Sequence, residues 1–248
     1  MTDVLVPEAP GRRRRGDMVI VRVPGAGWST RVHGRAVAVT IALCGAAFLA
    51  FAWSLSVGDY PIALSDVLAT LFGGGNEDTA FIIRRLRLPR GLTAALVGAG
   101  FGVSGAIFQR IARNPLASPD IIGVNAGAAA TAVFIIVIVG GSSMQITLGA
   151  LGGSLVTSLG VYLLAYKRGV TGYRLVLVGI GVTAMLTSVT QYLLTRAEIL
   201  DAARATVWLT GSLNGRSWDH VRPMAVAMAV LLPAAIALAR HLRMLELG

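Results

Sequence analysis

The chain has 248 residues, of which 55% are hydrophobic and only 14% are charged, and its formal net charge is +10. A soluble domain has about 25% charged residues, so this chain has too few for a water-soluble globule, and its hydrophobicity excludes wholesale disorder. The composition indicates an all-α polytopic membrane protein whose basic residues flank the spans and set their orientation, rather than one that binds nucleic acid.

Residues 1–35 are predicted to form a basic cytoplasmic tail. They hold seven arginines, from Arg12 to Arg35, and three prolines. A secretory signal would need a short apolar run with a small-residue cleavage site. The first apolar run is instead long enough to span a bilayer, so we expect it to be retained as a helix.

Residues 36–248 are predicted to form the transmembrane domain, because six stretches approach the roughly 20 apolar residues that a span needs. These stretches are Ala36–Val57, Gly91–Phe108, Ile121–Val139, Met144–Tyr166, Leu175–Thr195 and Val221–Ala239. With the N-terminus inside, the inner segments carry 14 basic residues and the outer segments 8, which the positive-inside rule favours. Without the tail, the count is 7 against 8. Between the first two spans, Ser65 is expected to cap a short helix.

Four arginines precede the second span, namely Arg84, Arg85, Arg87 and Arg90 around Pro89. An arginine at mid-bilayer costs about 2.5–3.5 kcal/mol, so we expect the four to form a basic collar on the outer face. The collar has two interpretations. It neutralises lipid phosphates, or it docks an acidic partner, since arginine binds carboxylates through two parallel hydrogen bonds.

Small residues recur at intervals of four in two spans. Ala94, Gly98 and Gly102 lie in the second span, and Gly149 and Gly153 lie in the fourth. This spacing lets helix backbones approach closely. The second span also contains a formal G-x-G-x-x-G pattern, but no strand precedes it as a dinucleotide site requires, so helix packing is the preferred interpretation.

A tight inner turn, Arg113–Asp120, is predicted between the second and third spans. Asn114, Pro115 and Pro119 lie in it, and the two prolines forbid one continuous helix. Ser118 followed by proline is typical of a helix N-cap with proline at the first helical position.

The fifth span carries four polar side chains, Thr183, Thr187, Thr190 and Gln191, which helical spacing places on one face. The face is either the wall of a polar pathway or a set of hydroxyls bonded to carbonyls of their own helix. Gln191 fits the second interpretation less well, because an amide in hydrocarbon needs a partner.

Neither an enzyme nor a cofactor site is indicated, and no catalytic residue is proposed. The phosphate-binding pattern G-x-x-x-x-G-K-[ST] is absent, and the three histidines His33, His220 and His241 are scattered without a cysteine or carboxylate cluster, so we expect no metal site. His220 is expected to lie at the membrane interface. Carboxylates are absent from the spans, which weighs against proton-coupled transport.

Several motifs, taken in chain order, resemble the iron-siderophore and vitamin B12 family of ABC importer permeases, with most similarity to its ferric-enterobactin branch. They are Arg87-Leu88-Pro89-Arg90, Gly105-Ala106-Ile107-Phe108-Gln109, Arg113-Asn114-Pro115-Leu116-Ala117-Ser118-Pro119, Gly211-Ser212-Leu213-Asn214-Gly215 and the ending Arg243-Met244-Leu245-Glu246-Leu247-Gly248.

The resemblance implies a multi-pass permease of the bacterial plasma membrane with about ten spans, of which six lie in this chain. It implies a second permease subunit, two cytoplasmic ATPases, and an extracytoplasmic binding protein that delivers a ferric siderophore. Arg87 and Arg90 would contact acidic residues of the binding protein, and the fifth span would line the pathway. The residues do not identify the siderophore.

The resemblance also implies coupling helices and further spans beyond Gly248. We therefore expect the chain to be a fragment or a truncated product, which would not transport alone. The alternative function is a six-span structural or channel-like protein without an ATPase partner.

Overall fold

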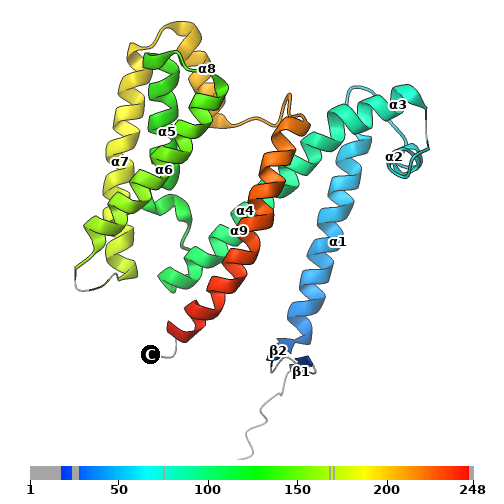
Figure 1. Cartoon of the computed structure of the whole chain (residues 1–248), viewed down its shortest axis with the longest axis horizontal. Helices are drawn as coiled ribbons and strands as arrows, with labels where there is room; N and C mark the ends of the chain where they lie inside the picture. The colour runs from blue at the N-terminus through cyan, green and yellow to red at the C-terminus, as the bar shows by residue number, and fades with distance from the viewer. Residues whose placement is uncertain (1–17, 24–27, 75, 168, 170, 246–248) are drawn as a thin grey trace, which may run out of the picture. The chain divides into compact units, whose positions relative to one another are not determined.

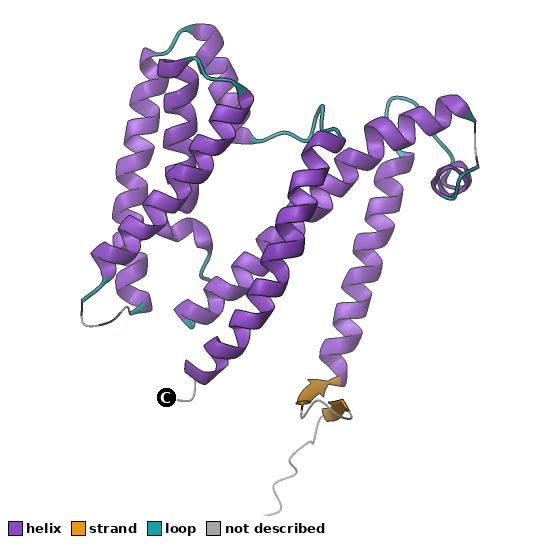
Figure 2. Cartoon of the chain, in the orientation of Figure 1, coloured by secondary structure: helices purple, strands orange, loops and turns teal. Residues whose placement is uncertain are grey.

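The computed structural model describes residues 18–23, 28–74, 76–167, 169 and 171–245, and most of them are helical (Figures 1 and 2). The chain divides into two compact units, Met1–Thr79 and Ala80–Gly248. The second unit contains all the residues of the candidate site.

The described part of the first unit begins with two paired antiparallel strands, β1 (Met18–Val23) and β2 (Trp28–His33). These strands lie within the predicted basic tail, for which no strand was expected. Helix α1 (Gly34–Ser56) follows directly, and α2 (Leu64–Leu71) comes after a short loop. Ser65 does not cap α2: the N-cap position is Ala63, whose extended backbone starts the helix before Ser65.

A nearly continuous helix leads into the second unit. It begins as α3 (Glu77–Phe81), widens into the π-helix η1 (Ile82–Arg87) and continues as α4 (Leu88–Ala112). Helix α9 (Trp218–Leu245) packs along α4 (Figure 1). Helix α4 ends where Arg113 adopts a left-handed conformation with φ of 51°, and the predicted inner turn follows.

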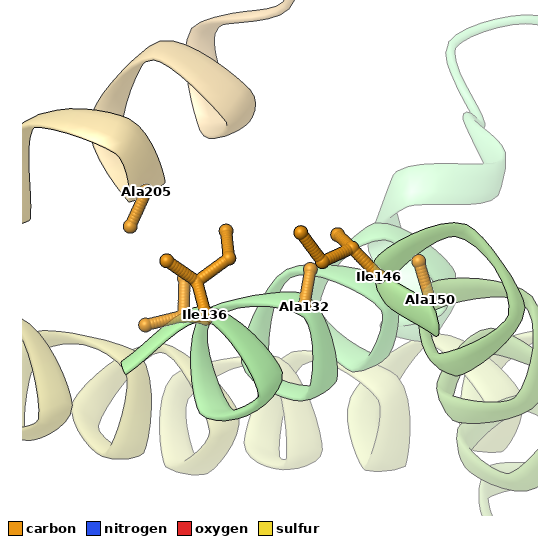
Figure 3. Close-up of a cluster of buried hydrophobic side chains, with 6 residues drawn as sticks. Ala132, Ile136, Ile146, Ala150 and Ala205 are labelled. Atoms are coloured by element: carbon orange, nitrogen blue, oxygen red, sulfur yellow. The ribbon is translucent and has the colours of Figure 1, made fainter. Parts of the chain in front are cut away.

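The other helices of this unit pack together around an apolar core (Figure 1). They are the 3-10 helix η2 (Pro119–Ile122), α5 (Val124–Phe134) with its π-helical end η3 (Ile135–Val139), α6 (Ser143–Ala165), α7 (Gly172–Arg196) and α8 (Ile199–Thr210). Figure 3 shows Ala132 and Ile136 next to Ile146 and Ala150 of α6, with Ala205 of α8 facing Ile136.

Local sequence explains where these helices begin and end. Ser142 and Gln145 form a capping box at the start of α6, in which each side chain accepts a hydrogen bond from the backbone N–H of the other. The segment formed by α5 and η3 lies between Gly123 and Gly140, whose φ angles of 77° and 68° are left-handed. Glycine adopts this conformation without steric cost, so Gly123 separates η2 from α5 and Gly140 ends η3.

Among the described residues, five helices are long and apolar enough to cross a membrane, namely Gly34–Ser56, Glu77–Ala112, Ser143–Ala165, Gly172–Arg196 and Trp218–Leu238. They overlap five of the six predicted spans, although the helix Glu77–Ala112 begins well before the predicted span Gly91–Phe108 and includes the arginine collar. The remaining one corresponds to the shorter apolar helix Val124–Val139. Large apolar side chains such as Leu155 and Met185, each 71% exposed, fit helices that face lipid or another subunit.

Candidate functional site

The arginine collar lies on a wide turn of helix. Arg84 and Arg85 belong to η1 and are exposed, Arg87 at its end is half-buried, and Arg90 on the first turn of α4 is exposed. π-helical turns are rare and often occur at functional sites. The collar is therefore a local departure from regular helix geometry as well as a concentration of positive charge.

The start of α9 holds the collar through one long-range hydrogen bond. The indole Nε1 of Trp218 donates to the backbone oxygen of Arg84 at 3.0 Å. The loop before α9 is also held by a hydrogen bond, in which Nε of Arg216 donates to the carbonyl oxygen of Ser212 at 3.0 Å. His220 is half-buried, and its Nδ1 accepts from the backbone N–H of Ser217 at 3.3 Å.

A pocket of about 910 Å³ lies between α4, the loop after α8 and the start of α9. Its lining includes Arg90, Phe101, Ser212, Asn214, Arg216 and His220. Arg90 is predicted for docking and His220 for the membrane interface, and the structure brings these two residues to one pocket, which the sequence alone does not predict. Arg216 was not proposed as a site residue at all, because more than one hundred positions separate it from Arg90 in the sequence.

The proposed docking residues Arg87 and Arg90 lie about one turn apart at the junction of η1 and α4. Of these two arginines, Arg90 is one of the described residues that line the pocket, and Arg87 is not. Two surfaces therefore meet at this helix end, the collar and the pocket, and Arg90 belongs to both. The docking role of the pair stays a prediction.

The four polar residues of the fifth span have different surroundings on α7. Thr190 is buried, and its hydroxyl donates to the carbonyl of Leu186 at 2.9 Å. Thr187 and Gln191 are exposed. Thr183 is half-buried, and in the described part of the chain its buried hydroxyl has no hydrogen-bond partner. Thr187 and Gln191 are thus the members accessible at the surface of the chain, and the pathway role stays a prediction.

The glycines predicted for helix packing fall into two groups. A Cβ atom built on Gly153 would lie 1.9 Å from Oγ1 of Thr131, and one on Gly149 would lie 2.0 Å from Cδ1 of Ile135. No described atom outside their own helix turn lies within 4 Å of such a Cβ at Gly98 or Gly102. Gly149 and Gly153 therefore sit where α5 and α6 touch, whereas Gly98 lines the pocket.

The inner turn is held by its own side chains. The Asn114 side chain accepts from the backbone N–H of Leu116 at 2.9 Å, so Pro115 lies inside a closed loop. The structure confirms Ser118 as an N-cap: its hydroxyl accepts from the backbone N–H of Asp120 at 3.3 Å, with Pro119 at the first helical position of η2. No metal-binding group of three or more His, Cys, Asp or Glu residues occurs among the described residues.

Replacing Trp218 with phenylalanine is expected to loosen η1 from α9. The ring volume is largely kept but the N–H donor is lost, and a typical hydrogen bond contributes about 1 kcal/mol. We expect amide hydrogen exchange of residues 82–87 to accelerate by about fivefold. Trp208→Phe on α8 is the matched control. Unchanged exchange in the Trp218 variant would show that this bond does not hold the collar.

Comparison with known proteins reveals a family likeness over most of the chain. Residues 41–248 match the model of the FecCD transport family. The chain is 41% identical over 217 residues to the ferric enterobactin transport system permease protein FepG of Escherichia coli, covering 88% of this chain and 66% of that protein. It is 34% identical over 203 residues to the iron(3+)-hydroxamate import system permease protein FhuG of Bacillus subtilis, covering 79% and 60%.

A solved structure resembles the fold as well. It is described as an inward-facing conformation of a putative metal-chelate type ABC transporter, with a TM-score of 0.69 and 25% sequence identity. The match covers 86% of this chain and 65% of that chain. This chain thus spans between 60% and 66% of the length of these three proteins.

Proposed function

The chain belongs to the FecCD transport family, and we propose that it is a permease subunit of an ABC importer that carries a ferric siderophore across the plasma membrane. It performs no chemistry on its cargo. ATP hydrolysis takes place in separate cytoplasmic subunits, and access to the cargo alternates between the two sides of the membrane. The chain itself is a multi-pass integral membrane protein.

The observation that carries this proposal is the extent of the family match, residues 41–248, which includes part or all of each apolar helix found among the described residues. The names of its relatives supply the cargo class, since FepG is a ferric enterobactin permease and FhuG an iron(3+)-hydroxamate permease. The partners we propose are a second permease subunit, two ATPase subunits and an extracytoplasmic binding protein.

We place docking of the binding protein at Arg87 and Arg90. Their position at one helix end, with Arg90 exposed, supports this assignment, because guanidinium groups bind carboxylates with directional pairs of hydrogen bonds. We place the cargo pathway along α7. Thr187 and Gln191 are exposed there, so they can face a second subunit or the cargo.

For orientation, we propose that residues 1–35 are cytoplasmic and that Arg84–Arg90 lie on the outer face. The count of 14 basic residues inside against 8 outside favours this direction, and two long-range contacts support the grouping of the outer segments on one side. Nη2 of Arg204 donates to the carbonyl of Gly141 at 3.1 Å, and Nε1 of Trp218 donates to that of Arg84 at 3.0 Å. In each pair both residues belong to segments that the charge count assigns to the outer side.

Thiol labelling in intact cells tests this orientation. In a Cys44→Ser background, Thr79→Cys is expected to react with a membrane-impermeant reagent, whereas Lys167→Cys is expected to react only after the membrane is permeabilised. Thr79 lies just before the collar, on the proposed outer side, and Lys167 lies in the loop between α6 and α7, on the proposed inner side. Labelling of Lys167→Cys but not Thr79→Cys would reverse the topology and remove the basis for docking at the collar.

Uptake of radioactive iron tests the function itself. Deleting the gene is expected to abolish uptake of iron presented as a ferric siderophore and to leave uptake of an unrelated sugar unchanged. Inactivating the Walker-A lysine of the partner ATPase should have the same effect as the deletion, because transport is driven from that subunit. Uptake that needs this chain but persists with the inactive ATPase would favour the channel-like alternative.

A further inference from the structure

The two strands β1 and β2, together called the strand pair, lie directly at the start of α1 (Figures 1 and 2). No linker separates them from the helix, because His33 ends β2 and Gly34 is the first residue of α1. The residues that match the family model begin only at position 41. The family likeness therefore does not account for the strand pair, and its role must follow from its own sequence and register.

The register of the strand pair sorts its residues into two faces of different character. Residues opposite each other on antiparallel strands share a face, and successive residues along a strand alternate between the faces. One face, called the apolar face, consists of Val19, Val21, Val23, Trp28, Thr30 and Val32. The other, called the basic face, consists of Met18, Ile20, Arg22, Ser29, Arg31 and His33. The strand pair is thus amphipathic.

The charge of this part of the chain has one sign. Arg22 and Arg31 lie in the strand pair and Arg35 lies in the first turn of α1, whereas β1, β2 and that turn contain no Asp or Glu. Residues 12–15 are four more arginines, separated from β1 by one carboxylate, Asp17. Because arginine binds phosphate through two parallel hydrogen bonds, the composition is complementary to a surface of phosphate groups.

The strand pair also needs a partner for its apolar face. A two-stranded sheet is marginally stable at best in water, and it becomes stable when a hydrophobic face is packed. Helix α1, which β2 contacts, is long and apolar enough to cross a membrane. The start of α1 therefore lies at the membrane surface, and so does the strand pair. Tryptophan is enriched at this depth, and Trp28 is on the apolar face.

We propose that the strand pair is a binding element for anionic phospholipids, which lies flat on the membrane surface beside the start of α1. The apolar face of an interfacial element enters the boundary between headgroups and acyl chains by about 5–10 Å. The opposite face is then level with the phosphates, which Arg22 and Arg31 bind. The inference requires that α1 crosses the membrane, and it is independent of the cargo and of the ATPase.

Spin labelling of the full chain tests this proposal. In a Cys44→Ser background, a single cysteine replaces Val21 or Thr30 on the apolar face, or Ile20 or Ser29 on the basic face. Each chain is reconstituted into vesicles of phosphatidylcholine alone or of equal parts phosphatidylcholine and anionic phosphatidylglycerol. In the anionic vesicles, labels on the apolar face are expected to collide mainly with lipid-soluble oxygen, and labels on the basic face mainly with a water-soluble nickel complex. In phosphatidylcholine alone, this difference between the faces should be much smaller.

Arg22→Gln combined with Arg31→Gln measures the electrostatic contribution. One basic residue near an anionic surface strengthens binding by about fivefold, so the loss of two should shift the equilibrium from lipid-bound to free strand pair by about thirtyfold. The shift is expected in the anionic vesicles, and it should shrink at high salt. Lysine at both positions keeps the charge but loses the planar fork, so most of the binding should remain.

Two further variants separate charge from apolar contact. Arg196→Gln combined with Arg222→Gln is the matched control, because it removes two positive charges at exposed positions outside the strand pair, and it should leave the labels on both faces unchanged. Trp28→Ser removes the aromatic residue of the apolar face. It should weaken lipid contact in both kinds of vesicle, since the burial of apolar surface does not depend on headgroup charge.

Several results would overturn the assignment to anionic lipid. Protection of the apolar face from both collision partners would show that protein covers it. The same difference between the faces in both kinds of vesicle, or an undiminished difference in the double glutamine variant, would show that anionic headgroups do not hold the strand pair. Absence of any difference in the anionic vesicles would show that the pair does not lie on the membrane. None of these results bears on the uptake experiment, which decides the proposed function separately.

Discussion

Gly153→Val is expected to separate α5 from α6 and to cost about 3 kcal/mol or more of stability, at the upper end of overpacking substitutions. A Cβ atom at this position would lie 1.9 Å from Oγ1 of Thr131 and 2.6 Å from the backbone oxygen of Gly127. The hydroxyl can rotate away, but the carbonyl belongs to the backbone of α5 and cannot. The measurement is thermal unfolding of the purified chain in detergent, followed by circular dichroism.

Two neighbouring variants make this prediction specific. Gly152→Val is the matched control, because no described atom outside its own turn lies within 4 Å of the Cβ position of Gly152, and it should unfold near the wild-type temperature. Thr131→Ala should not rescue Gly153→Val, since the clash with the Gly127 carbonyl remains. Equal stability of the Gly152 and Gly153 variants would mean that α5 and α6 do not approach closely in the folded chain.

Arg87→Glu combined with Arg90→Glu is expected to weaken docking of the binding protein by a hundredfold or more in the assembled transporter. Two charge reversals turn attraction into repulsion against acidic residues, and such like-charge contacts cost several kcal/mol, with about 1.4 kcal/mol per factor of ten. The loss should shrink at high salt, because exposed charges are screened beyond about 8 Å at physiological ionic strength. Lysine at both positions should be milder.

The control for this experiment changes the net charge equally at other outer positions. Arg196→Glu combined with Arg222→Glu alters two exposed arginines that lie outside the collar. Because Arg87 is half-buried, the unfolding temperature of each double variant must be compared with that of the wild type. If the collar variant binds the protein as tightly as wild type at low salt, the collar serves lipid contact or folding instead.

The long apolar spans were predictable because bilayer thickness sets a length that the sequence displays directly. Helix α8 was missed for the same reason. Its twelve residues are too short to span, and they include Asp201 and Arg204, so hydropathy alone gave no signal. Its position depends on Ala205 packing against Ile136 (Figure 3), and on the bond from Arg204 to Gly141. These are tertiary contacts between distant segments.

The charged residues and the inner turn of the candidate site could be predicted from the sequence, but the pocket could not. Local charge density marked Arg87 and Arg90, and the turn chemistry of Ser118 and Pro119 followed from proline geometry. The pocket could not be foreseen, because it forms only when the start of α9 meets α4 and brings Arg216 to the wall that carries Arg90. The π-helical turn of η1 left no sequence signal that we identified.

The helical segment between Gly123 and Gly140 is shorter than the hydrocarbon layer is thick, which bears on where water can reach the backbone. Its sixteen residues, Val124–Val139, extend over about 24 Å, whereas the hydrocarbon layer is about 30 Å thick. At least one of its glycine ends must therefore lie below the headgroups, where bare backbone is tolerated only against protein or in a water-filled cavity. At Gly123 that backbone lies against protein, because a Cβ atom there would be 3.3 Å from side-chain atoms of Thr157 and Thr183. At Gly140 no described atom lies within 4 Å of the Cβ position, so this is the end at which we expect water to reach the backbone.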